Sequence, residues 1–316
     1  MNRRNHQKGQ TTVLTLVFLT VLLGMGALVL DLGSWYRADR AAQSTADAAA
    51  LAGAQALPDD TSKATSSALE YAGKNGGGLG SGDITFSTKI VPNDTITVHV
   101  RRTAPGFFAK LFGFNSAQIG ATAAARAENI QAARYVAPIV VHYKHALLNC
   151  TRSSSPTCNP TFGATTTLTL SDLHQPGGGS GAGAFGLINL NQNDSSGTAS
   201  AGTLADWLAN GFDQYMQLGK YYSAPSANFN NSQFLTSLDS VIGKEVLFPV
   251  YRLLTGPGSN AQYDIIGWVG FVIQSYNVNG SSSTITGYFT HFIADGIQVD
   301  SGGNPDFGVR KVELVN

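Results

Sequence analysis

The feature that most constrains this chain is an uncharged segment close to its N-terminus. After Lys8 the next charged residue is Asp31. As an α-helix, residues 9–30 would be about 33 Å long. That length is enough to cross a hydrocarbon core of about 30 Å. We therefore predict a membrane-spanning helix over residues 11–32.

The charges before this segment predict its orientation. Arg3, Arg4 and Lys8 precede it with no acidic residue among them. Because basic residues favour the cytoplasmic side of a membrane, we expect residues 1–10 to form a cytoplasmic basic tail. The rest of the chain would then be extracytoplasmic, in a membrane protein with a single pass.

A cleaved secretory signal is the alternative interpretation of the same segment. Its apolar core would usually be roughly 7–15 residues long, with a small-x-small cleavage site after it. Here the apolar segment is longer, and residues 30–33 (LDLG) make a poor cleavage site. Trp35 and Tyr36 lie where an aromatic belt would meet the outer interface. We expect a retained anchor.

Helical character continues beyond the apolar segment. No proline occurs between Asp31 and Pro58, and alanine, the best helix former, dominates residues 41–56. We predict a helix extension over residues 33–57. Small residues recur on one face of it and would let a sheet or a second helix approach closely; this packing stripe is Ala42, Ala46, Ala49, Ala50, Gly53 and Ala54. The alternative is a plain helical stalk.

The segment GQTTVLTLVFLTVLLGMGALVLDLGSWYRADRAAQSTADAAALAGA resembles the N-terminal region of TadE/TadG-like Flp pilus-assembly proteins of bacterial tight-adherence systems. A weaker resemblance extends through about residue 130. The blocks GAFGLINLN, VLFPVY and DIIGWVGFVIQSY look similar to C-terminal regions of some members. The residues that carry the resemblance are Gly9-Gln10, Asp31-x-Gly33, Tyr36 and QSTADAAALAGA at 43–54.

The resemblance implies a pilin-like structural protein that supports assembly or anchoring of an adhesive Flp-type pilus. Its implied partners are the lipid bilayer and other pilus-assembly proteins or pilins, bound through helix packing, and a homo-oligomer stays open. Processed prepilins of this system carry Glu five residues after the cleavage-site glycine; counted from Gly9, that position is Leu14. An uncleaved protein therefore fits better. The second hypothesis is a surface adhesin or sensor whose β domain binds a ligand.

The residues after the helix predict a small antiparallel sheet packed against it. Residues 58–82 are polar and glycine-rich, which indicates a flexible connector. A pilin-like β region over 83–130 begins with a hairpin that turns at residues 91–94. Within it, residues 106–114 (GFFAKLFGF) have helical spacing and are expected to pack into the core, with docking to the outer leaflet as the alternative. A strand with an alanine face follows at 117–128.

The remainder, residues 135–316, predicts a mainly-β extracytoplasmic domain, a sandwich or a barrel-like fold. Strand patterns are frequent and helix signals are few. Thr203 is expected to cap one short helix, and Gly243 to follow the end of another. The predicted fold class is therefore α+β.

No site for catalysis, a cofactor or a metal is predicted. Charged residues make up 13% of the chain and the net charge is zero, so nothing indicates nucleic-acid binding. His142 and His145 have an odd spacing, which would place them on opposite faces of a strand. Glycine-rich residues 177–183, NDSSGT at 193–198 and DSGGNPD at 300–306 are interpreted as loops rather than phosphate or ion sites.

The two cysteines, Cys150 and Cys158, are predicted to form a disulfide. In an oxidising compartment it would close a short loop and add about 2.5 kcal/mol to stability. Two unrelated free thiols are the alternative.

Overall fold

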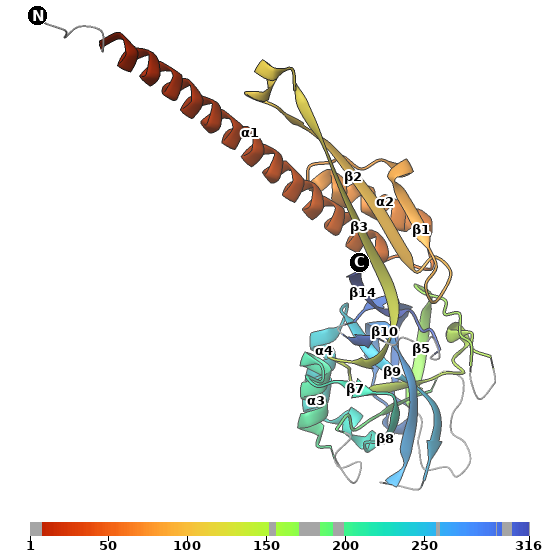
Figure 1. Ribbon diagram of the computed structural model, residues 1–316. Coiled ribbons are helices and arrows are strands. Elements are labelled where there is room, and N and C mark those ends of the chain that lie inside the picture. The colour runs from red at the N-terminus through yellow and green to blue at the C-terminus, as the bar shows by residue number, and fades with distance from the viewer. Residues whose placement is uncertain are drawn as a thin grey trace, which may run out of the picture. The chain divides into compact units, whose positions relative to one another are not determined.

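A computed structural model describes residues 8–151, 156–170, 184–191, 199–256, 260–294, 296–298 and 305–315. The chain forms two compact units (Figure 1). The first contains residues up to Ala127 together with Val312–Asn316, and the second contains Glu128–Lys311. The α+β class predicted from the sequence is confirmed, with a long apolar helix followed by sheets.

The first unit is built on one long helix, α1 (Lys8–Ala54). At 1.5 Å per residue its 47 residues extend over about 70 Å. The helix ends three residues before the predicted end at residue 57. Leu57 precedes Pro58, and a proline disfavours helical backbone in the residue before it. Turns therefore replace the last predicted helical residues.

A second helix, α2 (Thr61–Lys74), lies where a flexible connector was predicted over residues 58–82, so that prediction is wrong. The side chain of Asp60 caps α2 by accepting a hydrogen bond from the backbone N–H of Lys63 (2.8 Å). Ala64, Ala68 and Ala72 recur every four residues and are buried. This pattern was missed because polar residues fill most of the positions around the alanines.

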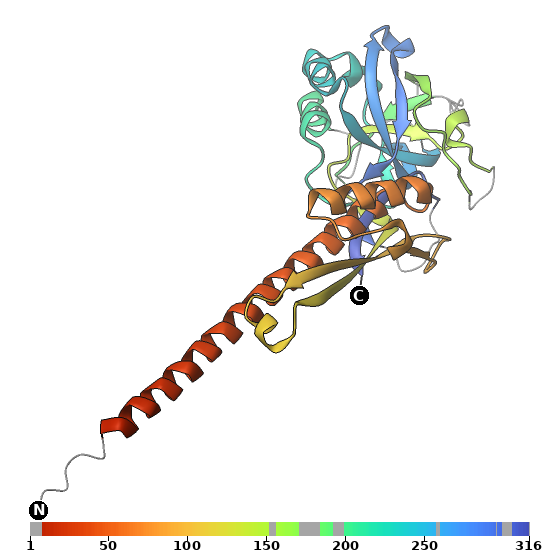
Figure 2. The same ribbon diagram turned by 90° about the horizontal axis from the view of Figure 1, so that it is seen from above.

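The sheet of the first unit is antiparallel over its first three strands. β1 (Ile84–Ser87) pairs with β2 (Thr95–Pro105), and β2 pairs with β3 (Ser116–Ala133) along its whole length. The predicted hairpin and the predicted alanine-faced strand are thus confirmed. In Figure 2, the C-terminal half of α1 lies alongside both α2 and the β2–β3 hairpin.

The C-terminal strand corrects the predicted domain boundary. β14 (Val309–Val315) is a neighbour of β3 in its sheet, and Val312 packs against the buried cluster of the first unit. The predicted domain 135–316 is therefore too long at its C-terminal end. Apolar residues near a chain end pair with strands that are distant in sequence, which the local pattern does not reveal.

The second unit contains a ring of hydrogen-bonded strands. The order is β11-β5-β6-β4-β9-β10, and β11 also pairs with β10, which closes the ring. Two pairs, β4–β9 and β5–β6, are parallel, and the other pairs of the ring are antiparallel. The strands are β4 (Ile139–His142), β5 (Thr165–Leu170), β6 (Ala184–Leu187), β9 (Glu245–Thr255), β10 (Gln262–Asn277) and β11 (Thr284–Thr290).

Strand β10 closes the ring because it is long. One edge pairs with β9; the other pairs first with β8 (Gly219–Tyr222) and then, from Gly270 to Asn277, with β11. Strands β10 and β11 are consecutive and pair antiparallel as a hairpin. The remaining short strands are β7 (Met216–Gln217), β12 (Phe292–Ile293) and β13 (Gly296–Gln298).

Two short helices cover one face of these strands, α3 (Ala201–Asn210) and α4 (Ser232–Val241). Their apolar residues share a core with Ile139 and Val141 of β4, while Val140 packs into a separate cluster. The predicted cap of α3 is corrected: Ser200, not Thr203, is the N-cap, and its hydroxyl accepts the N–H of Thr203 (3.0 Å).

Candidate functional site

The N-terminal part of α1 is apolar and exposed. Residues 11–30 carry no charge, and apart from the partly covered Ala27 all of them are exposed. Leu14, Leu23 and Val29 each leave about two thirds of their surface uncovered. Among the residues that the structure describes, α1 is the one helix long and apolar enough to cross a membrane. This arrangement fits a membrane anchor, because the hydrophobic effect disfavours such a surface in water.

The C-terminal part of α1 is buried along a seam of small residues. The five alanines of the seam have no exposed surface, and its glycine is buried. The seam packs in one cluster with Ile96, Val98 and Val100 of β2, with alanines of β3 and with α2. The small-residue seam, as we call it below, consists of Ala42, Ala46, Ala49, Ala50, Gly53 and Ala54.

Gly53 shows how closely the elements approach. A Cβ atom added there would lie 2.6 Å from the side chain of Ile96 and 3.0 Å from the backbone oxygen of Ala64. It would also lie 3.3 Å from the Cβ of Ala68. The first two distances are shorter than ordinary packing allows, so the absence of a side chain at Gly53 lets α2 and β2 meet α1 together.

A polar contact joins the same three elements beside the seam. The hydroxyl of Thr45, on α1, lies 2.7 Å from the carbonyl oxygen of Asn75, which follows α2. The Arg102 guanidinium of β2 donates to both of these oxygens at 2.7 Å. Charged donors strengthen hydrogen bonds, so this contact fixes the register of helix, helix and strand.

Asp31 holds the loop between β2 and β3. The residue is 2% exposed, and its carboxylate accepts the backbone N–H groups of Phe107 (2.7 Å), Phe108 (3.0 Å) and Ala109 (2.5 Å). These groups lie at the start of a 3₁₀ turn, Ala109–Phe112, whose free N–H donors need an acceptor. In the sequence, Asp31 is the end of the apolar span and part of the family resemblance. Its hydrogen bonds to the loop were not predicted.

The loop that Asp31 holds is apolar and exposed. We call residues 106–115, which join β2 to β3, the hairpin tip. Residues 106–114 were expected to pack into the core, and the structure corrects this: Leu111 and Phe112 are 82% and 79% exposed. The helical spacing was a poor guide because the carboxylate of Asp31 fixes the turn from its backbone side and leaves the side chains outside.

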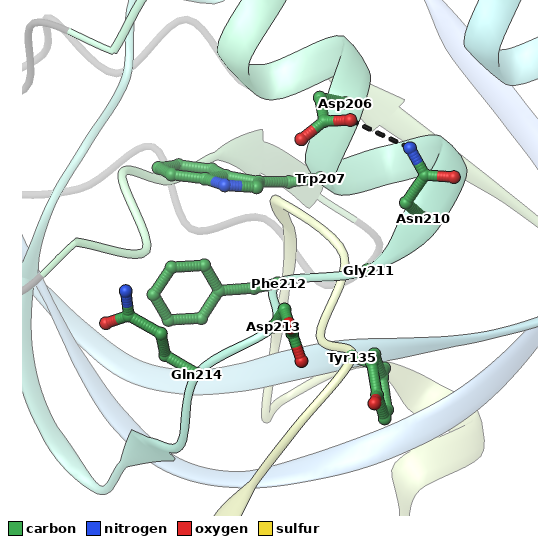
Figure 3. A pocket seen from close by; sticks show the side chains of 8 residues that line it. All are labelled: Tyr135, Asp206, Trp207, Asn210, Gly211, Phe212, Asp213 and Gln214. Carbon is green, nitrogen blue, oxygen red and sulfur yellow. Dashed lines mark hydrogen bonds between the residues drawn. The ribbon is translucent and has the colours of Figure 1, made fainter.

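The second unit has a shallow pocket of about 440 Å³ between α3 and the start of the following loop. Figure 3 shows Trp207 and Phe212 with polar side chains around them. The two aromatic rings meet edge to face with centroids 5.2 Å apart. The lining residues are Tyr135, Asp206, Trp207, Asn210, Gly211, Phe212, Asp213 and Gln214.

Both acidic side chains that line this pocket have a polar partner. Asn210 donates to Asp206 (2.7 Å), and Arg134 forms an ion pair with Asp213. The Arg134 guanidinium also lies 5.0 Å and 5.5 Å from the ring centroids of Tyr135 and Tyr215. The pocket therefore presents aromatic rings beside acidic groups that already have partners.

Cys150 and Cys158 form a disulfide eight residues apart in the second unit. His142 ends β4, and His145 caps the 3₁₀ turn that follows it. Within the described residues, no group of three or more His, Cys, Asp or Glu side chains is arranged to hold a metal.

The two buried histidines have depressed pKa values. Burial lowers the pKa of His142 to about 4, and the nearby positive charge of Lys144 acts in the same direction. Burial also lowers the pKa of His145. The ring of His142 lies between Tyr143 and Tyr251, with centroids 5.1 Å and 4.9 Å away. Both imidazoles are therefore neutral core groups near pH 7.

Three stretches considered as loops lie wholly or mostly outside the described residues. Residues 177–183 and the acidic Asp194 are among them, as are residues 300–304. Asp306, which is described, accepts the backbone N–H of Gly308 (2.9 Å) and pairs with Arg310. It acts there as a turn residue.

Comparison with known proteins bears on the N-terminal helix. Residues 9–56 match the sequence model of the family described as "Putative Flp pilus-assembly TadE/G-like". The match covers almost all of α1, including the exposed apolar part and the small-residue seam. No curated protein and no solved structure matches the chain significantly.

Proposed function

We propose that the protein is a membrane-anchored, pilin-like structural component that supports assembly or anchoring of an adhesive Flp-type pilus. The observation that carries the proposal is the division of α1: one part is an exposed apolar surface and the other a buried seam, within the segment that matches the pilus-assembly family. Residues 1–10 would lie in the cytoplasm, residues 11–32 would span the membrane, and the rest of the chain would lie outside the cytoplasm.

The proposed role is structural rather than catalytic. The exposed face of α1 would pack against helices of other pilus components, or of further copies of this chain, within the membrane. Between apolar helices in lipid, such association depends on van der Waals packing rather than on the hydrophobic effect. The two units would present sheet surfaces to partners outside.

The test is to delete the gene in its bacterial host and to place a photo-crosslinking residue at Val17, on the exposed part of α1. We expect the deletion to remove or shorten surface pili in electron micrographs. The crosslinker should capture a pilus component or a second copy of this chain. Normal pili in the deletion strain, with lipid as the sole crosslinked partner, would contradict the proposal.

A second function is favoured by the pocket of the second unit. Its aromatic rings and polar groups suit a surface adhesin or sensor that binds a small polar ligand. A Trp207→Ala, Asp206→Ala variant would then lose surface adhesion while its pili stay normal. If the role is structural, the variant should retain adhesion as well as normal pili.

A further inference from the structure

The hairpin tip carries five large apolar side chains that the protein leaves exposed. Their exposed fractions range from 40% to 82%, and they are contributed by ten consecutive residues. A patch of this kind marks a surface that another apolar phase covers. The five residues are Phe107, Phe108, Leu111, Phe112 and Phe114.

The position of the tip along α1 is set by hydrogen bonds. Asp31, which accepts three backbone N–H groups of the tip, is the first charged residue after the uncharged span. The indole N–H of Trp35, one turn later, donates to the carbonyl oxygen of Pro105 at 3.3 Å. If residues 9–30 fill about 33 Å of the bilayer, the tip lies at its surface.

The direction of the hairpin agrees with this depth. In both Figure 1 and Figure 2, the β2–β3 hairpin runs beside α1 and its tip extends toward the N-terminal half of that helix. The tip therefore lies beside α1 near the C-terminal end of its exposed apolar part, as the hydrogen bonds from the tip to Asp31 also require. Ala27, one turn before Asp31, is partly covered.

We propose that the hairpin tip is a second membrane-binding element, which inserts its aromatic side chains into the boundary between headgroups and acyl chains of the bilayer that α1 spans. Apolar rings with one cation suit this zone, because Lys110 can extend its ammonium group to the headgroups while its stem stays apolar. The proposal rests on α1 being the membrane anchor.

The lipid surface is favoured over a protein partner because the patch continues an apolar surface that must already lie in lipid. Asp31 ties the tip to α1 where the uncharged span ends, so the tip cannot leave the membrane surface while α1 is inserted. Two attachment points, one spanning and one interfacial, would fix the tilt and rotation of α1.

The test uses the full chain in vesicles of phosphatidylcholine and phosphatidylglycerol that contain a nitroxide-labelled phosphatidylcholine. Because Cys150 and Cys158 are paired, a single introduced cysteine can carry an environment-sensitive fluorophore. The probe sites are Phe112→Cys on the tip, Val17→Cys in the apolar part of α1, and Tyr71→Cys, an exposed control on α2. Leu111→Cys repeats the tip measurement at a second position.

We expect quenching by the lipid nitroxide at Phe112→Cys and Leu111→Cys to exceed that at Tyr71→Cys by about twofold or more, because an interfacial element lies within about 10 Å of the headgroup boundary. If Val17→Cys is quenched but the tip probes are quenched no more than Tyr71→Cys, the inference about the tip is overturned, while α1 remains supported as the membrane anchor.

Two further outcomes separate the alternatives. Absence of quenching at Val17→Cys would contradict the anchor, and with it the proposed function. The emission of a tip probe could instead shift to shorter wavelength without quenching, to an extent that depends on the protein-to-lipid ratio. That result would show that a second copy of the chain covers the tip, and it would overturn the bilayer as the partner.

Discussion

Asp31 illustrates how a single side chain joins two parts of the fold. A carboxylate that ends an uncharged span would ordinarily be exposed to water, but this one is buried against the backbone of the hairpin tip. Because the peptide N–H groups of a short turn lack partners, one carboxylate can satisfy three of them. The residue therefore has a structural role that its position beside an apolar segment does not reveal.

Asp31→Asn should loosen the tip without unfolding the protein. A hydrogen bond to a charged group is worth about 1.5–3 kcal/mol, which corresponds to roughly 10- to 100-fold faster amide exchange on local opening. Hydrogen exchange of the full chain in detergent should show this acceleration at Phe107, Phe108 and Ala109. Asp39→Asn, at an exposed acid on the same helix, is the matched control. Unchanged exchange in the Asp31 variant would show that the carboxylate does not hold the tip.

Ala50→Leu should destabilise the first unit. Ala50 has no exposed surface and faces a sheet that leaves little room, and overpacking a core typically costs about 1–3 kcal/mol. Ser44→Leu, on the exposed side of α1, is the control, since leucine has nearly the helix propensity of alanine. We expect a lower melting temperature for the first variant alone. Equal melting temperatures would show that the extension of α1 is a plain helical stalk without a closely packed face.

At the scale of elements, the strand β4 places a neutral histidine in the second unit. His142 lies between aromatic rings, and burial lowers its pKa to about 4. In the unfolded chain its pKa would be near 6.5. The unfolded state therefore binds a proton between these values that the folded state does not, so stability rises with pH across this window.

The free energy of unfolding should accordingly fall as pH is lowered from about 6.5 toward 4, and this contribution should level off below it. His142→Phe keeps a ring of similar shape and should make the dependence shallower. Part of it should persist, because burial also lowers the pKa of His145. Thermal melting of both proteins between pH 7 and pH 4.5 is the measurement, and identical slopes would contradict a buried neutral His142.

At the scale of the whole molecule, the chain leaves the first unit through β3 and returns to it through β14. The strand β3 belongs to the first unit up to Ala127 and continues to Ala133 in the second, and β14 crosses the same boundary near Val312. Both units therefore depend on strands that are far apart in sequence.

The orientation of the whole molecule can be read with a membrane-impermeant maleimide. Three basic residues and no acidic residue precede the apolar span, so the N-terminus should be cytoplasmic. In intact spheroplasts, Ser66→Cys on α2 should be labelled, whereas Gln7→Cys should be labelled after permeabilisation alone. The reverse pattern would invert the proposed topology.

The disulfide gives an independent test of the compartment. If the second unit folds outside the cytoplasm, Cys150 and Cys158 should resist alkylation until a reductant is added. Mass spectrometry of the protein, extracted from membranes under alkylating conditions, counts the modified thiols. Two modified cysteines without reductant would place the second unit in a reducing compartment.

The local pattern of the sequence was sufficient for features whose cause is local. The uncharged span between Lys8 and Asp31 determines a helix of membrane-spanning length, and the alanines after it determine both its continuation and the small face that packs. Alternation of apolar residues was likewise enough to predict the β1–β2 hairpin and the alanine-faced β3.

What only the tertiary structure decided is which surfaces meet. Alanines hold the α2 helix against α1, and Asp31 holds the apolar tip so that its side chains stay out of the protein core. The strand β14 lies beside β3, which is almost 200 residues earlier in the chain. The contacts of the tip and of β14 do not follow from periodicity, because they depend on groups distant in sequence that satisfy one another's hydrogen bonds or fill one another's space. Helical spacing in the hairpin tip indicates an apolar face, and the fold determines whether protein or another phase covers it.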